Sequence, residues 1–344
     1  MKKLLLIGNN TIHTAGFLEM AGSLVDEVMV LTNRETGHIR WEKMQTVDLS
    51  VRKIHSIPSS IRKIRSVIKA FDPDVIHVQQ AGTEAWLAVK ANNGMKPLVV
   101  SALGSDILLT PGKGRLFRKM TKEILKKAEV IICDSAYVAY VIHSLAGDGC
   151  CPRVEIIHPG TELPKDLPEK EKMIYSNRMH HDLYRIDQII RAFADFCKAR
   201  EKESWKLVIA GSGPQTVTLK GLTDKLKMDG KVEFTGWVDR QKNMDFYRRA
   251  MIYVSNPVSD ATSVGLLEAM AAGCVPVLSN LPANHEWVID GYNGVICEHI
   301  CGTSFRKALS LDGRKISRIN REILAGKADK HKNREKYLAI YRAL

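Results

Sequence analysis

Short apolar runs alternate with helical patterns along the first half of the chain. Each run is rich in Leu, Ile or Val; the runs cover 3–8, 27–32, 74–80, 97–103, 130–135 and 154–160. Runs of this length suit buried strands, and the longer intervals between them suit helices. The alternation predicts a parallel sheet with crossover helices, so we expect a Rossmann-like α/β domain.

The second half repeats this alternation. Its apolar runs cover 173–178, 205–211, 232–237, 251–256 and 275–280. A polar, proline-bearing stretch over 161–172 separates the two series and is predicted to be a linker. We therefore expect an α/β fold with two Rossmann-like domains facing a cleft, one over 1–165 and one over 170–324.

The last segment, 313–344, is basic and helical. Apolar side chains recur in it at helical spacing: Ile316, Ile319, Ile323, Tyr337, Ile340 and Tyr341. No strand pattern follows them. We expect this segment to pack back across the first domain, with about 325–344 belonging to that domain and making it discontinuous.

Composition narrows the class of protein. The chain has 344 residues, 45% of them hydrophobic, and a net charge of +13 from 51 Lys and Arg against 38 Asp and Glu, which favours an anionic partner. No stretch approaches the ~18 apolar residues of a membrane span, and the N-terminal apolar run has no signal cleavage site. The seven cysteines form no C-x-x-C pair, so we expect reduced thiols and a cytoplasmic protein.

A cluster of small polar residues precedes an apolar helix in SDATSVGLLEAMAAGCVPVLSN, residues 259–280. The first N–H groups of a helix lack intrahelical acceptors and lie at the positive end of its dipole. A diphosphate is stabilised there without a metal. The sequence therefore predicts an anion site at the start of this helix, formed by Thr262, Ser263, Val264 and Gly265.

Two carboxylates, Asp260 and Glu268, flank the start of the same helix. Their spacing places one before the helix and the other about two turns inside it, so both can face one cleft. For an isolated pair, a helix cap and a solvated side chain would be the favoured interpretation. The apolar setting LLEAMAAG argues against a solvated Glu268, because an unpaired carboxylate is costly to bury there.

Arginines open the second domain, in SNRMHHDLYRIDQIIRAF. Arg178 follows a predicted strand and Arg185 lies near the next helix, so both can neutralise a leaving diphosphate. Two surface arginines are the alternative. His180 and His181 are adjacent and have no partner at helical spacing, which argues against a metal site.

Two glycine turns end strands of the second domain. AGSGP, with Gly211 and Gly213, permits close backbone approach, and VEFTGWV presents Trp237 and Val238 in the loop that follows. Each turn is a weak signal alone. Their order ahead of the helix at 264 strengthens the prediction of a nucleotide site.

These motifs, SNR, AGSGP, FTGWV and the 259–296 stretch, follow in the order and spacing of a known family. The chain resembles the GT-B glycosyltransferases of family 4, which are retaining and depend on nucleotide-sugars. The resemblance covers the whole chain and is strongest from 173 to 300. It implies the GT-B fold, no cofactor or required metal, and a nucleotide-sugar substrate, with UDP the first choice by family frequency.

The resemblance also implies roles for individual residues. Arg178 and a second basic residue would bind the pyrophosphate, Glu268 the ribose hydroxyls and Asp260 the transferred sugar. The backbone at Ser263 and Val264 would meet the diphosphate or sugar. The loop at Trp237 and Val238 would pack beside the base.

The chain departs from the family at three places. Asp260 stands where the family has Glu, and Tyr184-Arg185 occupies the area of its second basic residue, usually Lys. Leu103-Gly104-Ser105-Asp106 corresponds to a His-Gly-x-Asp turn without its histidine. Asp106 either faces the cleft as a catalytic group or caps the next turn.

The N-terminal domain is expected to close over the donor and to bind the acceptor. Its first loop, 8–16, offers Asn10, Thr11 and His13 for the donor. The acceptor would attack from the front face while the departing phosphate takes its proton, so no protein nucleophile is needed. Such closure makes 161–172 and the C-terminal crossover candidate hinges.

A basic helical face in the first domain bears on the acceptor. It comprises Arg115, Arg118, Lys119, Lys122 and Lys126. This face either binds an anionic membrane carrying a lipid-linked acceptor, at the inner surface, or is a solvated helix face. A glycan or lipid-linked acceptor in polysaccharide or glycolipid synthesis is compatible with both interpretations of this face. The basic stretches lack interleaved aromatics, so we expect no nucleic-acid partner.

Two other functions compete with this interpretation. A NAD-dependent dehydrogenase or epimerase predicts a G-x-G-x-x-G turn after the first strand, and 8–13 reads GNNTIH instead. A non-catalytic, glycosyltransferase-like subunit is suggested by Asp260 and Leu103, and opposed by Glu268 and Arg178. Turnover of a nucleotide-sugar separates this non-catalytic subunit from an active glycosyltransferase.

Overall fold

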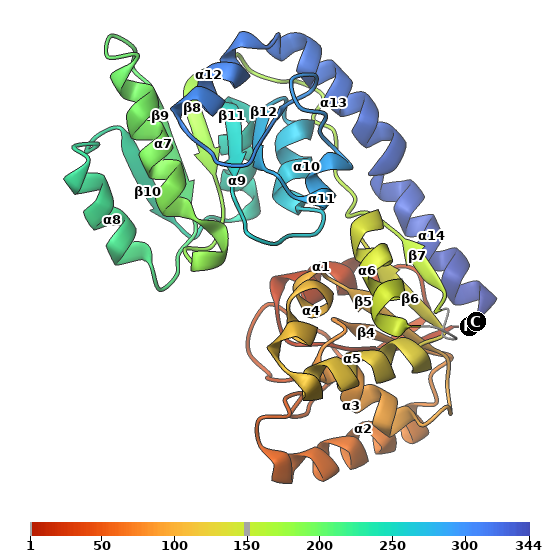
Figure 1. Ribbon diagram of the computed structural model, residues 1–344. Helices are drawn as coiled ribbons and strands as arrows, with labels where there is room; N and C mark the ends of the chain where they lie inside the picture. The colour runs from red at the N-terminus through yellow and green to blue at the C-terminus, as the bar shows by residue number, and fades with distance from the viewer. Residues whose placement is uncertain (1, 148–151) are drawn as a thin grey trace. The chain divides into compact units, whose positions relative to one another are not determined.

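The computed structural model describes residues 2–147 and 152–344, which form two compact units (Figure 1). Unit 1 comprises Met1–His158 with His331–Leu344, and unit 2 comprises Pro159–Lys330. Both are α/β, with helices on the two faces of a parallel sheet. The predicted pair of Rossmann-like domains is confirmed.

Unit 1 contains a 7-stranded parallel sheet in the order β3-β2-β1-β4-β5-β6-β7. Its strands are β1 (Lys3–Ile7), β2 (Glu27–Thr32), β3 (Met44–Thr46), β4 (Val75–Gln79), β5 (Leu98–Ala102), β6 (Val130–Cys133) and β7 (Val154–Ile156). The six predicted apolar runs all contain a strand. The edge strand β3 was missed, because its three residues, MQT, show no hydrophobic pattern.

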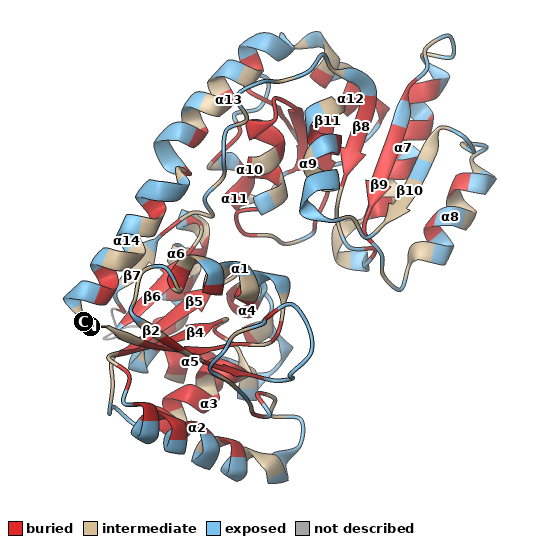
Figure 2. Cartoon of the chain, turned by 180° about the vertical axis from the view of Figure 1, so that it is seen from behind, coloured by how far each residue is buried: buried red, intermediate tan, exposed pale blue. Residues whose placement is uncertain are grey.

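Helices cover both faces of this sheet and bury their sheet-facing sides (Figure 2). The helices are α1 (Ile12–Ala21), α2 (Ile57–Phe71), α3 (Thr83–Asn92), α4 (Ser105–Leu108), α5 (Arg115–Lys127), α6 (Ala136–Ala146) and α14 (Lys330–Ala343). Tyr341 of α14 lies in the core, and its hydroxyl is 2.6 Å from Nδ1 of the buried His77 on β4. Burial lowers the pKa of His77 to about 3, so this imidazole is neutral at physiological pH.

Unit 2 contains a 6-stranded parallel sheet in the order β10-β9-β8-β11-β12-β13. Its strands are β8 (Glu171–Ser176), β9 (Lys206–Ala210), β10 (Val232–Gly236), β11 (Ala250–Ser255), β12 (Val275–Ser279) and β13 (Val295–Cys297). The helices are α7 (Ile186–Lys198), α8 (Thr216–Lys225), α9 (Arg240–Arg249), α10 (Val264–Ala271), α11 (Pro282–His285), α12 (Gly302–Ser310) and α13 (Gly313–Lys327). Five of these six strands coincide with predicted apolar runs, and the short edge strand β13 was not predicted.

The segment predicted as a linker packs on unit 2. The ammonium group of Lys170 donates to the carbonyls of Tyr247 (3.0 Å), Arg248 (2.9 Å) and Ala272 (2.6 Å), at the carboxyl ends of α9 and α10. Arg321 of α13 donates to the carbonyl of Pro164 at 2.7 Å. Unit 2 therefore begins at Pro159 rather than at 170.

The basic C-terminal segment divides into two helices with different partners. Ile316 and Ile323 of α13 pack against the two cores of unit 2, whereas Ile340 and Tyr341 of α14 pack in unit 1. Helix α13 thus lies in unit 2, and α14 is the part of 313–344 that packs on the first domain. Both helices are amphipathic, and the sequence does not show which core each one covers.

Both sheets have a topological switch point, between β1 and β4 in unit 1 and between β8 and β11 in unit 2. The crossover connections leave in opposite directions there, which opens a crevice outside the carboxyl ends of the two strands. Ligands of open parallel sheets bind in such crevices. The residues that follow β8 and β11 are therefore the first place to look for a site.

Candidate functional site

Arg178 and Asp260 lie at the switch point of unit 2. Arg178 follows β8 and Asp260 follows β11, and their side chains form an ion pair. The guanidinium also donates from Nε to the hydroxyl of Ser255 at 2.8 Å and lies over the ring of Tyr184, 5.2 Å from its centroid. The two side chains are 15% and 23% exposed, so the pair is mostly desolvated yet reachable by a ligand.

Helix α10 begins directly after this pair. Its N-cap is Ser263, whose hydroxyl accepts from the backbone N–H of Leu266 at 3.3 Å. The N–H groups of Val264 and Gly265 have no intrahelical acceptor, as in the first turn of any α-helix. Trp287 donates to the hydroxyl of Thr262 at 3.3 Å, which fixes the residue before the cap. The predicted anion site thus has the required local geometry.

Glu268 lies on α10 above a buried cluster of phenols and amides. Asn243 of α9 donates from Nδ2 to Glu268 Oε2 at 3.4 Å, and its Oδ1 accepts from the hydroxyl of Tyr175 at 2.6 Å. Asn177 joins the cluster by donating to the hydroxyl of Tyr247 at 2.7 Å. Burial raises the pKa of Glu268, although Arg240 and a hydrogen bond from Tyr247 oppose that shift.

Gly265 lets the helix approach this cluster closely. A Cβ at this position would lie 2.8 Å from the hydroxyl of Tyr253, 2.9 Å from that of Tyr247 and 3.0 Å from Oδ1 of Asn177. Any larger residue would push α10 away from the polar cluster. The role of Gly265 in this structure is therefore close packing as well as its place in the first turn.

The glycine turn 210–214 supports the loop that carries Arg178. Gly211 has φ +113°, and a Cβ there would lie 2.6 Å from the carbonyl of Arg178. A Cβ on Gly213 would lie 2.5 Å from the carbonyl of His180. His180 is buried and its Nδ1 is 2.8 Å from the hydroxyl of Thr216. These glycines position the arginine loop; their approach to a donor stays a prediction.

Arg185 differs from its predicted role. It has φ +45°, and its guanidinium donates to the carbonyls of Asn256 and Pro257 at 2.9 Å each and to the side chain of Asn256 at 3.0 Å. These contacts hold the segment that leads from β11 to Asp260. The structure gives Arg185 a bracing contact, and Tyr184, which precedes it, is the residue that touches Arg178.

The loop after β10 separates the two residues predicted to lie beside a base. Trp237 is 61% exposed, whereas Val238 packs against the core of unit 2. The indole is therefore free to stack on a flat ligand. Val238 contributes to the fold instead.

In unit 1, Asp106 braces a turn. Its carboxylate accepts from the backbone N–H groups of Ala81 (2.7 Å), Leu103 (3.1 Å) and Ile107 (3.2 Å), and the residue is only 4% exposed. These bonds tie the loop after β4 to the turn after β5. Asp106 lies inside α4, whose N-cap is Gly104, so it holds the turn through these backbone groups rather than as a cap, and its predicted catalytic role receives no support.

Asn10 and Thr11 are also engaged locally. The buried side chain of Asn10 accepts from the N–H of Ile39 at 2.8 Å and donates to the carbonyl of Arg34 at 3.2 Å. Thr11 is the N-cap of α1 and accepts from the N–H of Thr14 at 3.3 Å. Both predicted donor residues thus shape the first loop, and His13 is exposed on the first turn of α1.

Glu84, which lies near the switch point of unit 1, is a further buried carboxylate that was not among the predicted site residues. Glu84 is in the first turn of α3, is buried, and accepts from Nδ2 of Asn9 at 3.1 Å. Desolvation, together with the nearby Asp106, raises its pKa to about 7. The apolar pattern TEAWLAV around this carboxylate was the available signal.

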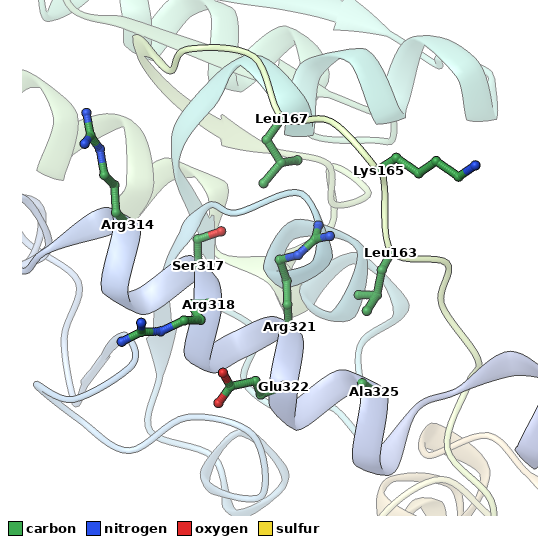
Figure 3. Close-up of a pocket in the computed structure, with 9 residues that line it drawn as sticks. All are labelled: Leu163, Lys165, Leu167, Arg314, Ser317, Arg318, Arg321, Glu322 and Ala325. Carbon is green, nitrogen blue, oxygen red and sulfur yellow. The ribbon is translucent and has the colours of Figure 1, made fainter.

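A hollow of about 580 Å³ lies elsewhere on unit 2, between 163–167 and α13 (Figure 3). Arg314, Arg318 and Lys165 extend from its rim in different directions, and Arg321 is bonded to backbone carbonyls. Its cations do not converge on a common ligand position. The hollow therefore lacks the arrangement seen around Arg178.

Over the described ranges 2–147 and 152–344, no three His, Cys, Asp or Glu side chains gather in a group suited to a metal ion. In the same part of the chain, every helix is too short or too polar to cross a membrane.

Sequence comparison identifies two families along the chain. The family described as "Glycosyl transferase 4-like" matches residues 3–135, and "Glycosyl transferases group 1" matches residues 162–307. The two matches follow the division into unit 1 and unit 2.

Two curated relatives are similar to the chain. An uncharacterised glycosyltransferase of Methanocaldococcus jannaschii is 28% identical over 186 residues, covering 51% of this chain and 47% of that protein. The alpha-monoglucosyldiacylglycerol synthase of Streptococcus pneumoniae is 25% identical over 309 residues, covering 78% and 67%. The chain thus spans about half the length of the archaeal relative.

Among solved structures, Anabaena HepE in complex with UDP and glucose is similar in fold, with a TM-score of 0.82, 14% identity and 100% coverage of both chains. Two parallel-sheet units with the switch-point site in unit 2, and two family matches that together span most of the sequence, lead to one conclusion. The chain belongs to the GT-B glycosyltransferases of the family 4-like type.

Proposed function

We propose that this glycosyltransferase moves a sugar from a UDP-sugar to a glycan or lipid-linked acceptor with retention of configuration. The observation that carries the proposal is the Arg178–Asp260 pair at the switch point of unit 2, directly before the N-terminus of α10. A guanidinium and a free helix N-terminus bind the diphosphate of such a donor. The adjacent carboxylate binds sugar hydroxyls.

Three features support a nucleotide donor at this site. Glu268, with one oxygen bonded to Asn243, accepts the ribose hydroxyls, and the exposed Trp237 stacks on the base. HepE, which shares the fold, was solved with UDP and glucose, and this favours UDP over other nucleotides. The frequency of UDP among the donors of the family favours the same choice.

In the proposed reaction the protein stabilises the charge of the leaving group and orients the donor and the acceptor. The donor diphosphate takes the place of Asp260 on Arg178, and Asp260 turns to the transferred sugar. The acceptor hydroxyl attacks from the face that the diphosphate leaves, and the departing phosphate oxygen takes its proton. Arg178 and the α10 N–H groups stabilise the charge that develops on the leaving group, so no metal is required.

The acceptor is proposed to be lipid-linked and presented at an anionic membrane surface, on the cytoplasmic side. On α5, Arg115, Arg118, Lys119 and Lys126 are exposed, Lys122 is half-buried, and Leu116 is 64% exposed among them. Met120 points into the core and holds this face outward. The pneumococcal relative is a glycolipid synthase by name, which favours a lipid acceptor here.

The test is nucleotide release from a panel of UDP- and GDP-sugars in EDTA. We expect one UDP-sugar to release UDP, and we expect Arg178→Ala and Glu268→Ala to abolish release. Arg314→Ala and Glu322→Gln, which change exposed residues of α13, serve as matched controls and retain the wild-type rate. The anomeric configuration of the product, read by NMR, tests retention.

Four other outcomes would contradict parts of this proposal. Release of GDP alone would replace the proposed nucleotide, and release that stops in EDTA and returns with Mg²⁺ would overturn the metal-free mechanism. Donor binding without release, even with lipid acceptors present, would favour the non-catalytic subunit that Asp260 and Leu103 suggest. Absence of binding across the panel would exclude a nucleotide-sugar donor.

A further inference from the structure

Two cysteines lie together where β13 meets α12, a corner of unit 2 to which the reaction assigns no residue. Cys297 is the last residue of β13, and Cys301 is the N-cap of α12. Both contact the hydroxyl of Ser304: the Cys297 thiol donates to it at 3.2 Å, and Cys301 Sγ lies 3.6 Å from it. Both sulfur atoms thus lie within contact distance of one hydroxyl group.

The setting of Cys301 favours its thiolate. Its side chain accepts from the backbone N–H of Ser304, while the Ser304 hydroxyl accepts from the N–H of Cys301 at 3.2 Å, which completes a capping box. The hydroxyl of Thr303 lies 2.8 Å from Cys301 Sγ. The side chain at an N-cap position accepts a hydrogen bond from the backbone, and a thiolate is a stronger hydrogen-bond acceptor than a thiol. The helix dipole acts in the same direction.

The two sulfurs differ in exposure and in acidity. Cys301 is exposed, and hydrogen bonding to Thr303 is the largest cause that lowers its pKa. Cys297 is half-buried, and burial raises its pKa. Cys133, Cys197 and Cys274 are buried. Among these five described cysteines, an accessible thiol with stabilised negative charge occurs at Cys301 alone.

We propose that Cys301 is a nucleophilic modification site for peroxides, with Cys297 as its resolving thiol. The Cys301 thiolate attacks one peroxide oxygen; the O–O bond breaks, hydroxide leaves and a sulfenic acid forms. The Cys297 sulfur then attacks the sulfenic sulfur, loses its proton, and displaces the hydroxyl as water, which forms a disulfide. Two thiols are oxidised by two electrons in total, and one hydrogen peroxide is reduced to two waters.

The disulfide would change how the N-terminus of α12 is capped. A sulfur in a disulfide carries no negative charge, so Cys301 would cease to cap α12 as a thiolate does. Helix α12 packs against α7, and β13 pairs with β12. The site is therefore a modification point within unit 2 whose chemistry is independent of the donor and acceptor.

The first experiment measures alkylation by iodoacetamide at pH 7, residue by residue, using mass spectrometry of the full-length protein after digestion. We expect Cys301 to react faster than a free cysteine in a short peptide when both are compared at limiting reagent, and Thr303→Val to slow Cys301 several-fold. Thr303 is exposed, so this variant should fold normally. Equal rates for Cys301, the peptide and the variant would overturn the proposed thiolate.

The second experiment treats the protein with hydrogen peroxide and digests it with a glutamate-specific protease under non-reducing conditions. Cleavage after Glu298 falls between the two cysteines, so a Cys297–Cys301 disulfide joins fragments 287–298 and 299–322. We expect this joined pair in the wild type and its loss on reduction. Cys297→Ser should instead give a Cys301 sulfenic acid that dimedone traps. Fragments that stay separate in the wild type would overturn the resolving role of Cys297.

Discussion

The guanidinium of Arg178 and the carboxylate of Asp260 form an ion pair, although 82 positions separate them in the chain. Two parallel strands, β8 and β11, end side by side and bring them together. In the proposed reaction this pair is the resting arrangement, and the donor diphosphate competes with Asp260 for Arg178. The pair therefore predicts an effect of the nucleotide on stability.

We expect a double-mutant cycle of Arg178→Gln and Asp260→Asn to give a coupling of about 1–2 kcal/mol in the free protein. The pair is mostly desolvated, so each single variant leaves a charge without its partner and is destabilised more than the double variant. With saturating UDP the coupling should shrink, because the diphosphate then occupies Arg178. Urea unfolding of the four proteins with and without UDP measures it. An unchanged coupling would place UDP away from Arg178.

The cluster beneath Glu268 predicts a positioning role for Asn243. In Asn243→Leu the donor to Glu268 Oε2 is lost and the hydroxyl of Tyr175 loses its acceptor. We expect KM for the nucleotide-sugar to rise by roughly tenfold, about 1.4 kcal/mol, with a smaller change in kcat. Discrimination between ribose and deoxyribose donors should fall as well.

The matched control for that variant is Gln241→Ala, on the exposed side of the same helix. It should retain wild-type KM and discrimination. If Asn243→Leu lowers kcat alone and leaves the ribose preference intact, Glu268 does not owe its orientation to Asn243.

Glu84 predicts a pH dependence of stability. Its pKa is raised to about 7 in the folded chain, above the usual value near 4.5, so the folded state holds a proton that the unfolded state releases. Stability from this group is full below pH 4.5 and is lost as pH rises through 7. Across that window, we expect the free energy of unfolding to fall by up to about 3 kcal/mol.

Glu84→Gln removes the titrating group while keeping its shape, so this variant should match the wild type at pH 5 and exceed it in stability at pH 8. Denaturant unfolding of unit 1, followed over this pH range, gives the comparison. Glu35→Gln, an exposed carboxylate of the same unit, should track the wild type. Parallel pH profiles for Glu84→Gln and wild type would contradict the assigned pKa.

The basic face of α5 predicts binding to anionic membranes. Each Lys or Arg near such a surface contributes about 1 kcal/mol, so replacing Arg115, Arg118 and Lys119 by Ala should weaken vesicle binding by about 3 kcal/mol, roughly a hundredfold. Co-sedimentation with phosphatidylglycerol vesicles at low and at physiological salt measures the effect.

A triple alanine variant of three exposed lysines in unit 2, Lys220 and Lys225 of α8 and Lys227 in the turn after it, carries the same charge change. It should bind vesicles like the wild type. If both triple variants lose affinity equally, net charge rather than the α5 face accounts for binding, and a solvated helix face becomes the better interpretation of α5.

The two α/β domains and most of their strands could be predicted from the sequence. Buried parallel strands need continuous apolar runs. Where a strand is five or six residues long, its apolar run can be recognised in the sequence. Strand β3 was missed because MQT shows no hydrophobic pattern, and β13 was missed because its apolar run, VIC, has only three residues. The motif at 259–280 was also sufficient to place the start of α10, because a cap and an apolar helix are local features.

The contacts of the polar side chains, in contrast, became visible only in the folded chain. Arg178 and Arg185 were both predicted to neutralise the diphosphate, yet Arg178 pairs with Asp260 and Arg185 bonds to the carbonyls of Asn256 and Pro257. The carboxylate of Asp106 accepts hydrogen bonds from backbone N–H groups, and Glu84 is buried near the switch point of unit 1. Apolar burial follows a pattern along the chain, whereas a charged group's role depends on partners that distant segments bring to it.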